Sequence, residues 1–283
     1  MLEAYTARNF RKFKEWFQKL ATKTKLAVCI YNMKSLFSWI LIGSIALLAG
    51  CKMKTYNSLD SAYRDAENTE KLVLYRKKIG VLPPDIARLA NLKELRVFKC
   101  NLYSIPPEIG MLDSLEELVL SNNHLDSLPP EIGNLKKLKR LSLHHNNLKT
   151  LPKEIGQLES LESLNLAYNN LTELPQEIML LKNLKYLYLS FNDLKKFPLG
   201  VEYLEKLEIL DLERNDLEEI PAELAGCQKL LVLNVAYCGT ATDVPDELCK
   251  SLSLEELVVG RNTVVPVCFA APSYRRLQII LRP

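Results

Sequence analysis

The chain has 283 residues, enough for one domain with a continuous core, and a formal net charge of +3 from 37 Lys and Arg against 34 Asp and Glu. The excess of positive charge lies at the beginning. Residues 1–50 hold eight of the basic residues and two of the acidic ones, which leaves 29 and 32 in the remainder. This slightly acidic main part gives no electrostatic reason to expect nucleic acid as a partner.

Residues 1–50 form a leader, and its core at residues 33–50 has the layout of a secretory signal peptide. Lys34 follows Met33, an apolar run spans Leu36–Leu48, and small residues come after the run. The run is shorter than the ~20 apolar residues that a membrane-spanning helix needs. A short membrane anchor or a buried helix is the alternative interpretation.

The first 32 residues need a separate explanation. Residues 1–32 are basic and aromatic, which is typical of an amphipathic helix on a membrane surface. The alternative is that translation begins at Met33 and that the preceding segment is a gene-start artefact. We favour the second interpretation, because a signal peptide counted from Met33 has an ordinary length.

The leader ends in a short motif, Leu48-Ala49-Gly50-Cys51. This motif resembles the lipobox of bacterial lipoproteins. The resemblance implies that the chain is cut before Cys51 and that lipid attached to this cysteine anchors the protein to a membrane. Lys52 follows, and not the Asp that retains such proteins in the inner membrane of enteric bacteria. The expected location is therefore the bacterial cell envelope, as an outer membrane lipoprotein, facing the periplasm or the outside.

Residues 51–57 read as a polar tether, and residues 58–68 as an N-terminal capping helix. Ser58 is a residue type that favours the N-cap position of a helix. The apolar residues after it have helical spacing: Leu59, Ala62, Tyr63 and Ala66. Such a helix is expected to cover the exposed edge of the first strand, which otherwise invites mispairing.

Residues 69–253 repeat with a fixed period. A proline recurs every 23 residues, at Pro83, Pro106, Pro129, Pro152, Pro175, Pro198 and Pro221. An asparagine keeps the same step at Asn123, Asn146, Asn169, Asn192 and Asn215. A period of this length indicates one supersecondary unit copied along an axis.

Each part of the repeat L-x-x-L-x-L-x-x-N-x-L-x-x-L-P-x-x-I-x-x-L has a physical interpretation. Leu118 and Leu120 alternate with variable residues, which predicts a strand with one apolar side. The Asn that follows is suited to bonding backbone groups that the strand ladder leaves unpaired. After the Pro, which fixes φ, Ile132 and Leu135 suit a short helix or 3₁₀ turn.

This pattern resembles the leucine-rich repeat family. The resemblance implies an α/β solenoid of about eight to nine repeats, with a curved parallel sheet on the concave face and short helices or 3₁₀ turns on the convex face. Residues 254–283 read as a degenerate last repeat and C-terminal cap. Cys249 and Cys268 lie near this cap and are candidates to pair in an oxidising compartment, although the sequence does not fix their separation.

No motif for catalysis or cofactor binding is present. The sequence contains no nucleophile elbow, Walker loop, CxxC or HExxH. The three histidines lie in adjacent repeats and are interpreted as solvent-facing, so no metal is expected. Charged residues at variable positions, such as Glu116 and Glu117, indicate a solvated face. The chain is therefore expected to be a binding protein with no cofactor, and not an enzyme.

The variable positions of the strands indicate a binding surface on the concave face and its rim. Aromatic residues gather there over repeats four to six, flanked by arginine, which is typical of interface hot spots. Strand propensity alone also favours Tyr and Phe, and this is the alternative. The predicted partner-binding residues are His144, His145, Tyr168, Tyr186, Tyr188, Phe191, Arg214 and Tyr237.

These observations predict a membrane-anchored lipoprotein that binds a macromolecular partner, above all a protein, on its concave face. Two alternatives stay open. One is an envelope adhesin or structural protein that holds glycan or host matrix through the same aromatic residues. The other is a cytosolic scaffold resembling the Ras-binding group of leucine-rich repeat proteins, which requires that the Leu36–Leu48 run is never used as a signal.

Overall fold

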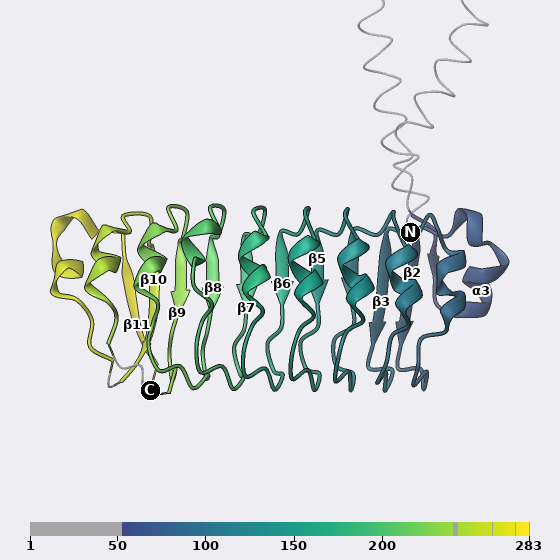
Figure 1. Cartoon of the computed structure of the whole chain (residues 1–283), viewed down its shortest axis with the longest axis horizontal. Coiled ribbons are helices and arrows are strands. Elements are labelled where there is room, and N and C mark those ends of the chain that lie inside the picture. The colour runs from purple at the N-terminus through teal and green to yellow at the C-terminus, as the bar shows by residue number, and fades with distance from the viewer. Residues whose placement is uncertain (1–52, 240–242, 262, 275, 283) are drawn as a thin grey trace, which may run out of the picture. The chain divides into compact units, whose positions relative to one another are not determined.

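The computed structural model describes residues 53–239, 243–261, 263–274 and 276–282 (Figure 1). Internal contacts divide the chain into two units, Met1–Met53 and Lys54–Pro283. The predicted leader and the predicted lipidation site at Cys51 lie outside the described residues. They therefore stay predictions, and the fold described below is that of the second unit.

The described residues of this unit build one 11-stranded parallel sheet in which the strands follow chain order (Figure 1). The strands are β1 (Thr55–Tyr56), β2 (Lys71–Tyr75), β3 (Glu94–Phe98), β4 (Glu117–Val119), β5 (Arg140–Ser142), β6 (Ser163–Asn165), β7 (Tyr186–Tyr188), β8 (Ile209–Asp211), β9 (Val232–Asn234), β10 (Glu256–Gly260) and β11 (Gln278–Arg282). The predicted class, a leucine-rich solenoid with one parallel sheet, is confirmed.

The register of the sheet reproduces the sequence period. Leu118 pairs with Leu141, which pairs with Leu164, so the step from strand to strand is 23 residues. Between β9 and β10 the step is 24, because Leu233 pairs with Leu257. The extra residue of the eighth repeat is therefore accommodated in its loop, and the sheet register after it is restored.

A 3₁₀ helix joins most successive strands. The segments are η1 (Ala66–Asn68), η2 (Pro84–Arg88), η3 (Pro107–Met111), η4 (Pro130–Asn134), η5 (Lys153–Gln157), η6 (Gln176–Leu180), η7 (Val201–Tyr203), η8 (Ala222–Gly226), η9 (Asp246–Lys250), η10 (Val267–Ala270) and η11 (Pro272–Tyr274). In η4, extended Pro129 precedes the turn, and the amide of Ile132 donates to the Pro129 carbonyl at 3.1 Å. Five residues between a fixed proline and the next strand leave room for this tighter helix and not for an α-helix.

The core lies between the sheet and the 3₁₀ turns and consists of the consensus leucines and isoleucines. Leu118, Leu120 and Ile132 are fully buried, and the same positions are buried in the other central repeats. Adjacent turns also pack closely, because a Cβ added to Gly133 would lie 2.5 Å from the carbonyl oxygen of Glu154. No repeat buries its leucines alone, so each unit completes the core of its neighbours.

The repeated asparagine joins three consecutive repeats, as the sequence pattern predicted. Asn169 is 7% exposed. Its Nδ2 donates to the carbonyls of Leu143 at 3.1 Å and Leu166 at 2.9 Å, and its Oδ1 accepts from the amide of Leu148 at 3.1 Å. One side chain thus satisfies three buried backbone groups at the place where the strand ladder stops.

The N-terminal end differs from the sequence prediction in one respect. Thr55–Tyr56, assigned to the tether of residues 51–57, forms β1 and pairs with β2, so a strand and not the helix occupies the first sheet edge. The helix α3 (Leu59–Arg64), capped by Ser58, covers the end of the core with fully buried Ala62. A two-residue strand carries too little alternation to be predicted from sequence.

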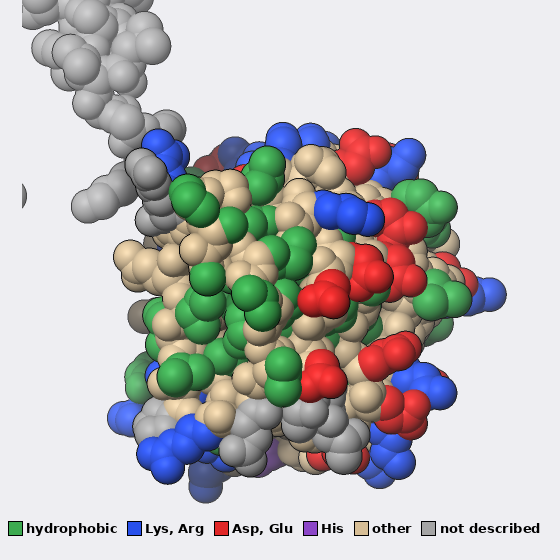
Figure 2. Space-filling model, turned by 90° about the vertical axis from the view of Figure 1, so that its left-hand side faces the viewer, with side chains coloured by type: hydrophobic (Ala, Val, Ile, Leu, Met, Phe, Trp, Pro, Cys, Tyr) green, Lys and Arg blue, Asp and Glu red, His purple; other side chains and the backbone are tan. Residues whose placement is uncertain are grey.

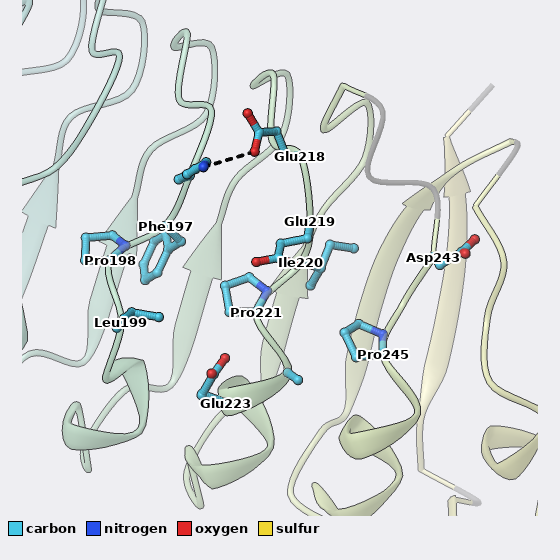
Figure 3. A pocket seen from close by; sticks show the side chains of 12 residues that line it. Phe197, Pro198, Leu199, Glu218, Glu219, Ile220, Pro221, Glu223, Asp243 and Pro245 are labelled. Atoms are coloured by element: carbon cyan, nitrogen blue, oxygen red, sulfur yellow. Dashed lines mark ion pairs between the residues drawn. The ribbon is translucent and has the colours of Figure 1, made fainter.

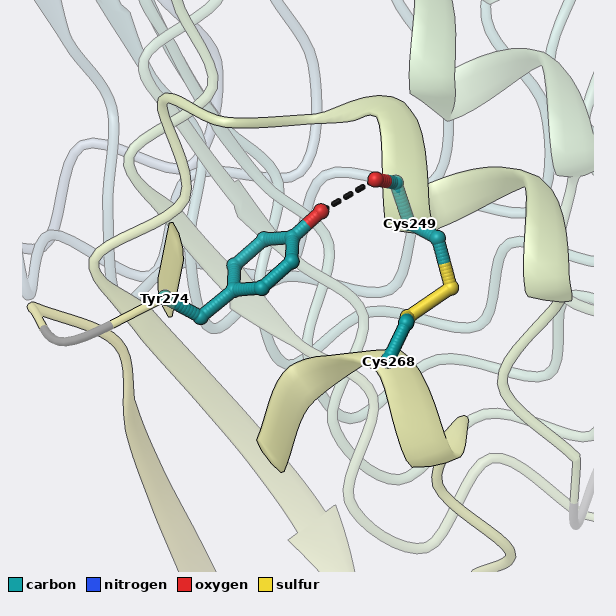
Figure 4. Close-up of a disulfide and its surroundings, with 3 residues drawn as sticks. All are labelled: Cys249, Cys268 and Tyr274. Atoms are coloured by element: carbon teal, nitrogen blue, oxygen red, sulfur yellow. Dashed lines mark hydrogen bonds between the residues drawn. A yellow bond between two sulfur atoms is a disulfide. The ribbon is translucent and has the colours of Figure 1, made fainter. Parts of the chain in front are cut away.

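The C-terminal end is held by a disulfide between Cys249 in η9 and Cys268 in η10, whose Cα atoms lie 5.9 Å apart (Figure 4). The hydroxyl of Tyr274 donates to the carbonyl of Cys249, and its ring meets Phe269 edge-on at 5.0 Å. The pairing that the sequence left undecided is therefore present. Among the described residues, no helix has the length and apolar character needed to cross a membrane.

The asparagine bonds lead to a stability prediction with a matched control. Asn169→Ala is expected to lower the free energy of unfolding by about 2–4 kcal/mol, because three buried backbone groups lose their partner. Asn170→Ala replaces the exposed neighbour and is expected to change it by less than about 0.5 kcal/mol. Chemical denaturation of both variants measures the difference. Equal stability of the two variants would show that the asparagine row does not hold the repeats together.

Candidate binding surface

The residue that follows each strand by one turn has an unusual backbone conformation. At eight repeat-equivalent positions φ lies between 51° and 58°, in the left-handed region: Arg76, Lys99, Asn122, His145, Tyr168, Phe191, Arg214 and Tyr237. This conformation costs roughly 1–2 kcal/mol for a residue with a Cβ, and it is rare for bulky side chains. Glycine or asparagine would relieve the cost, so large side chains kept here point to a use.

Five of these residues form one continuous stack, which we call the aromatic row: His145, Tyr168, Phe191, Arg214 and Tyr237. The ring centroids of His145 and Tyr168 lie 4.1 Å apart, and those of Tyr168 and Phe191 also lie 4.1 Å apart. The guanidinium of Arg214 lies 5.2 Å from the Phe191 ring and 5.0 Å from the Tyr237 ring. Parallel strands about 4.8 Å apart place equivalent side chains at stacking distance.

The remaining predicted residues lie beside this row or on the sheet itself. His144 meets His145 edge-on at 5.5 Å, and burial lowers its pKa, as does the neighbouring histidine. Tyr186 and Tyr188 lie on β7 and are half-buried. A hydrogen bond to Glu208 raises the pKa of Tyr186, and burial raises that of Tyr188. The structure thus divides the predicted patch into a row at the strand ends and a tyrosine pair on the strand.

Sequence analysis missed a charged network on the same sheet face at β2–β5. Glu94 and Glu117 are each 7% exposed, which corrects the interpretation of Glu117 as part of a solvated face. Lys71 pairs with Glu94 at 2.7 Å, Arg96 bridges both glutamates, and Arg140 pairs with Glu117. Opposite charges at positions one repeat apart were the signal available in the sequence. These pairs neutralise the N-terminal part of the face.

Two carboxylates follow the tyrosine pair at β8. Burial raises the pKa of Asp211, although the amide of Glu213 and the side chains of Ser190 and Asn234 donate hydrogen bonds to it. Glu213 accepts a hydrogen bond from Asn234 at 3.0 Å. The sheet face therefore changes from compensated charge, through tyrosine, to hydrogen-bonded carboxylate along the direction of stacking.

A separate cavity of about 680 Å³ lies among the loops that lead from the strands to the 3₁₀ turns (Figure 3). Buried Phe197 and Ile220 contribute to its apolar part, and Lys196 pairs with Glu218 at 3.3 Å at its rim. The local sequence explains it: Gly200 adopts φ 84° where other repeats have a continuous 3₁₀ segment, and η7 is shortened to three residues. Its lining residues are Lys196, Phe197, Pro198, Leu199, Glu218, Glu219, Ile220, Pro221, Ala222, Glu223, Asp243 and Pro245.

The chemistry of the described residues fits binding better than catalysis. Burial raises the pKa of Cys227 and of Cys238 to about 12, so neither thiol is a nucleophile at neutral pH. Cys238 donates instead to the carbonyl of Leu212 at 2.9 Å, in place of the repeated asparagine. No cluster of three or more metal-ligating side chains occurs in the described part of the chain.

Comparison with known protein families fits this architecture. The leucine rich repeat model matches residues 90–148, 113–171 and 136–194, and a model for two copies of such repeats matches residues 182–223. Residues 90–223 are leucine-rich repeats. The chain has no match among curated proteins. Leucine-rich repeat proteins are generally non-enzymatic interaction scaffolds, in agreement with the expectation that this chain is not an enzyme.

Solved structures with the same fold include receptors and an internalin. The ectodomain of the Arabidopsis thaliana receptor kinase GASSHO1/SCHENGEN3, in complex with CASPARIAN STRIP INTEGRITY FACTOR 2, is 26% identical with a TM-score of 0.64 over 80% of this chain. The plant peptide hormone receptor RGFR1, in complex with RGF2, is 25% identical with a TM-score of 0.60 over 77% of this chain. The chain spans only 31% and 42% of these two receptor chains.

The internalin InlF of Listeria monocytogenes is similar in fold alone. It is 16% identical with a TM-score of 0.63, over 81% of this chain and 73% of its own. Receptors and an internalin thus share the solenoid, whose fold is typical of protein-binding domains. Which residues bind in this chain is a separate question, addressed below.

The left-handed backbone of the aromatic row is testable by stability alone. Tyr168→Gly and Tyr168→Ala both remove the stacked ring, but only glycine accepts a φ of 56° without steric cost. Tyr168→Gly is therefore expected to unfold with a free energy about 1 kcal/mol higher than Tyr168→Ala. Urea unfolding of the two variants measures the difference, and an alanine variant of equal or greater stability would contradict it.

Proposed function

We propose that this protein is an exported bacterial lipoprotein, held in the outer membrane by lipid on Cys51, whose repeats bind a protein partner on the face of the sheet that carries Tyr188. The observation that carries the binding part is the aromatic row. Large side chains are kept at left-handed positions, where Tyr168 is 41% exposed and Tyr237 is 39% exposed. Aromatic side chains next to arginine are enriched among residues that dominate binding energy.

The geometry of the row favours protein over glycan as the partner. Sugar rings stack on the open face of an aromatic ring. In the row, Tyr168 has His145 on one side and Phe191 on the other, each at a centroid distance of 4.1 Å. Both faces of this central ring are therefore covered, and its edge and hydroxyl remain for contact. Backbone carbonyls and mixed side chains of a protein suit such an edge.

Two further observations support export and a protein partner. The Cys249–Cys268 disulfide fits an oxidising compartment, which favours the envelope over a cytosolic scaffold. Two receptors of similar fold were solved in complex with CASPARIAN STRIP INTEGRITY FACTOR 2 and with RGF2, so this fold presents surfaces on which such partners bind.

The binding site is tested by a double substitution. Tyr188→Ala with Phe191→Ala removes one ring from the tyrosine pair and one from the row. This variant is expected to weaken binding of a captured protein partner by about 2 kcal/mol or more. Its melting temperature is expected to stay close to that of the parent, because neither ring belongs to the leucine core. Affinity capture with mass spectrometry identifies the partner, and titration calorimetry measures the loss.

Tyr203→Ala is the matched control, since Tyr203 is a 64% exposed tyrosine on η7, away from the sheet face. It is expected to bind normally. If the double variant also binds normally, the sheet face is not the site, and the cavity beside Phe197 becomes the next surface to substitute.

The lipid anchor is tested separately, so that its failure leaves the binding site standing. Cys51→Ala is expected to leave the precursor uncut and without lipid, whereas Cys29→Ala removes a cysteine of the leader and is expected to have no effect. Intact mass spectrometry of membrane fractions measures both. A Cys51→Ala protein with the mature mass of the parent would contradict the anchor.

Sorting gives a second measurement of the same proposal. In an enteric host, Lys52→Asp is expected to move the protein from the outer to the inner membrane, by the same lipobox resemblance. Density-gradient fractionation of the two variants shows the distribution. Recovery of the parent protein in the inner membrane alone would contradict outer-membrane sorting.

A further inference from the structure

The last strand, β11, has an open edge among the described residues. It pairs with β10 alone, and all five of its residues, Gln278–Arg282, are exposed. Ile279 is 42% exposed and Leu281 is 65% exposed, although they stand in register with Leu257 and Val259, which are fully buried. Two side chains on the core side of the sheet thus lack the cover that the next repeat gives elsewhere.

This end of the solenoid has the layout of an interface. Figure 2, which faces the C-terminal end, shows apolar side chains gathered in the middle, with acidic and basic side chains around them. An apolar centre with a polar rim is characteristic of protein–protein contacts. The opposite end differs, because α3 lays fully buried Ala62 over the core there.

The hydrogen bonds of β11 determine which groups are free to pair. The amide of Gln278 donates to the Glu255 carbonyl of the preceding loop at 2.8 Å. Along a strand, successive residues direct their backbone groups to alternate sides. The N–H and C=O groups of Gln278, Ile280 and Arg282 therefore point to β10, and those of Ile279 and Leu281 point to the open edge.

We propose that β11 pairs antiparallel with β11 of a second copy of this chain, about a two-fold axis at Ile280. In this register Ile279 lies opposite Leu281 of the other copy and exchanges both backbone hydrogen bonds with it, twice by symmetry. The apolar side chains of the two copies then cover each other. A shift of one residue would oppose free groups to groups already bonded to β10, and would turn the apolar side chains to the wrong face.

The polar residues of β11 explain why the occupant is a second copy. Under the two-fold axis, Gln278 lies opposite Arg282, so no like charges face each other directly. Ile280 lies opposite itself as a pair without mutual hydrogen bonds, where Cα atoms come within about 4.5 Å. The five-residue strand is therefore complementary to itself in side-chain size, charge and backbone bonding.

Cysteine cross-linking of the full chain in cells tests the register. Ile280→Cys is expected to give a disulfide-linked dimer on a non-reducing gel after mild oxidation, because opposed Cα atoms fall within the disulfide range. Gln278→Cys and Arg282→Cys are each expected to stay monomeric alone and to cross-link when the two variants are co-expressed. The parent chain is the blank for its native cysteines, of which Cys227 and Cys238 are buried.

Two results would overturn the proposal: no dimer from Ile280→Cys, or self-linking by Gln278→Cys as efficient as that by Ile280→Cys. A charge substitution gives an independent readout. Leu281→Asp, combined with Ile280→Cys, is expected to lower the cross-linked fraction about tenfold, with an unchanged melting temperature. Leu180→Asp, which charges a 59% exposed leucine on η6, is the control and is expected to leave cross-linking intact.

Discussion

A buried asparagine that bonds three consecutive repeats is the interaction on which the rest of the structure depends. The leucines supply the burial energy, but they do not fix where a strand stops. Asn146 accepts from the amide of Leu125 in the repeat before and donates to Leu120 and Leu143. These bonds end each strand at the same level, so the chain turns toward the 3₁₀ segment at the same place in every repeat. The periodic sheet follows from that repeated stop.

The same stop creates the candidate site. A chain that leaves a strand sharply needs one residue with positive φ just before the asparagine, and Tyr168 precedes Asn169 in this way. Because the position repeats at the strand spacing, any flat side chains placed there must stack. The aromatic row is therefore a consequence of backbone geometry combined with the choice of side chain. Arg214 extends the stack with a planar cation where an aromatic ring is absent.

Much of this architecture could be predicted from the sequence because a period records both the unit and its neighbours. Leu118, Asn123 and Pro129 each kept their assigned role. The failures share a cause, which is that they depend on contacts that the period does not contain. β1 is too short to alternate, Glu117 is buried by Arg96 and Arg140 from the repeats on either side, and the cavity arises where Gly200 interrupts the consensus. The sequence placed His145, Tyr168 and Phe191 in one patch but could not show that they stack face to face.

The disulfide between η9 and η10 also affects how the molecule opens. A stack of units that touch only their neighbours frays from its ends, one repeat at a time, and rising protection toward the centre is the usual mark of such a zipper. Cys249 and Cys268 belong to successive turns of chain, so the bond makes the last two units open together or not at all. In a reducing environment the C-terminal end regains its independence, and amide exchange there separates into two steps. The redox state of the surroundings thus sets the length of the cooperative unit.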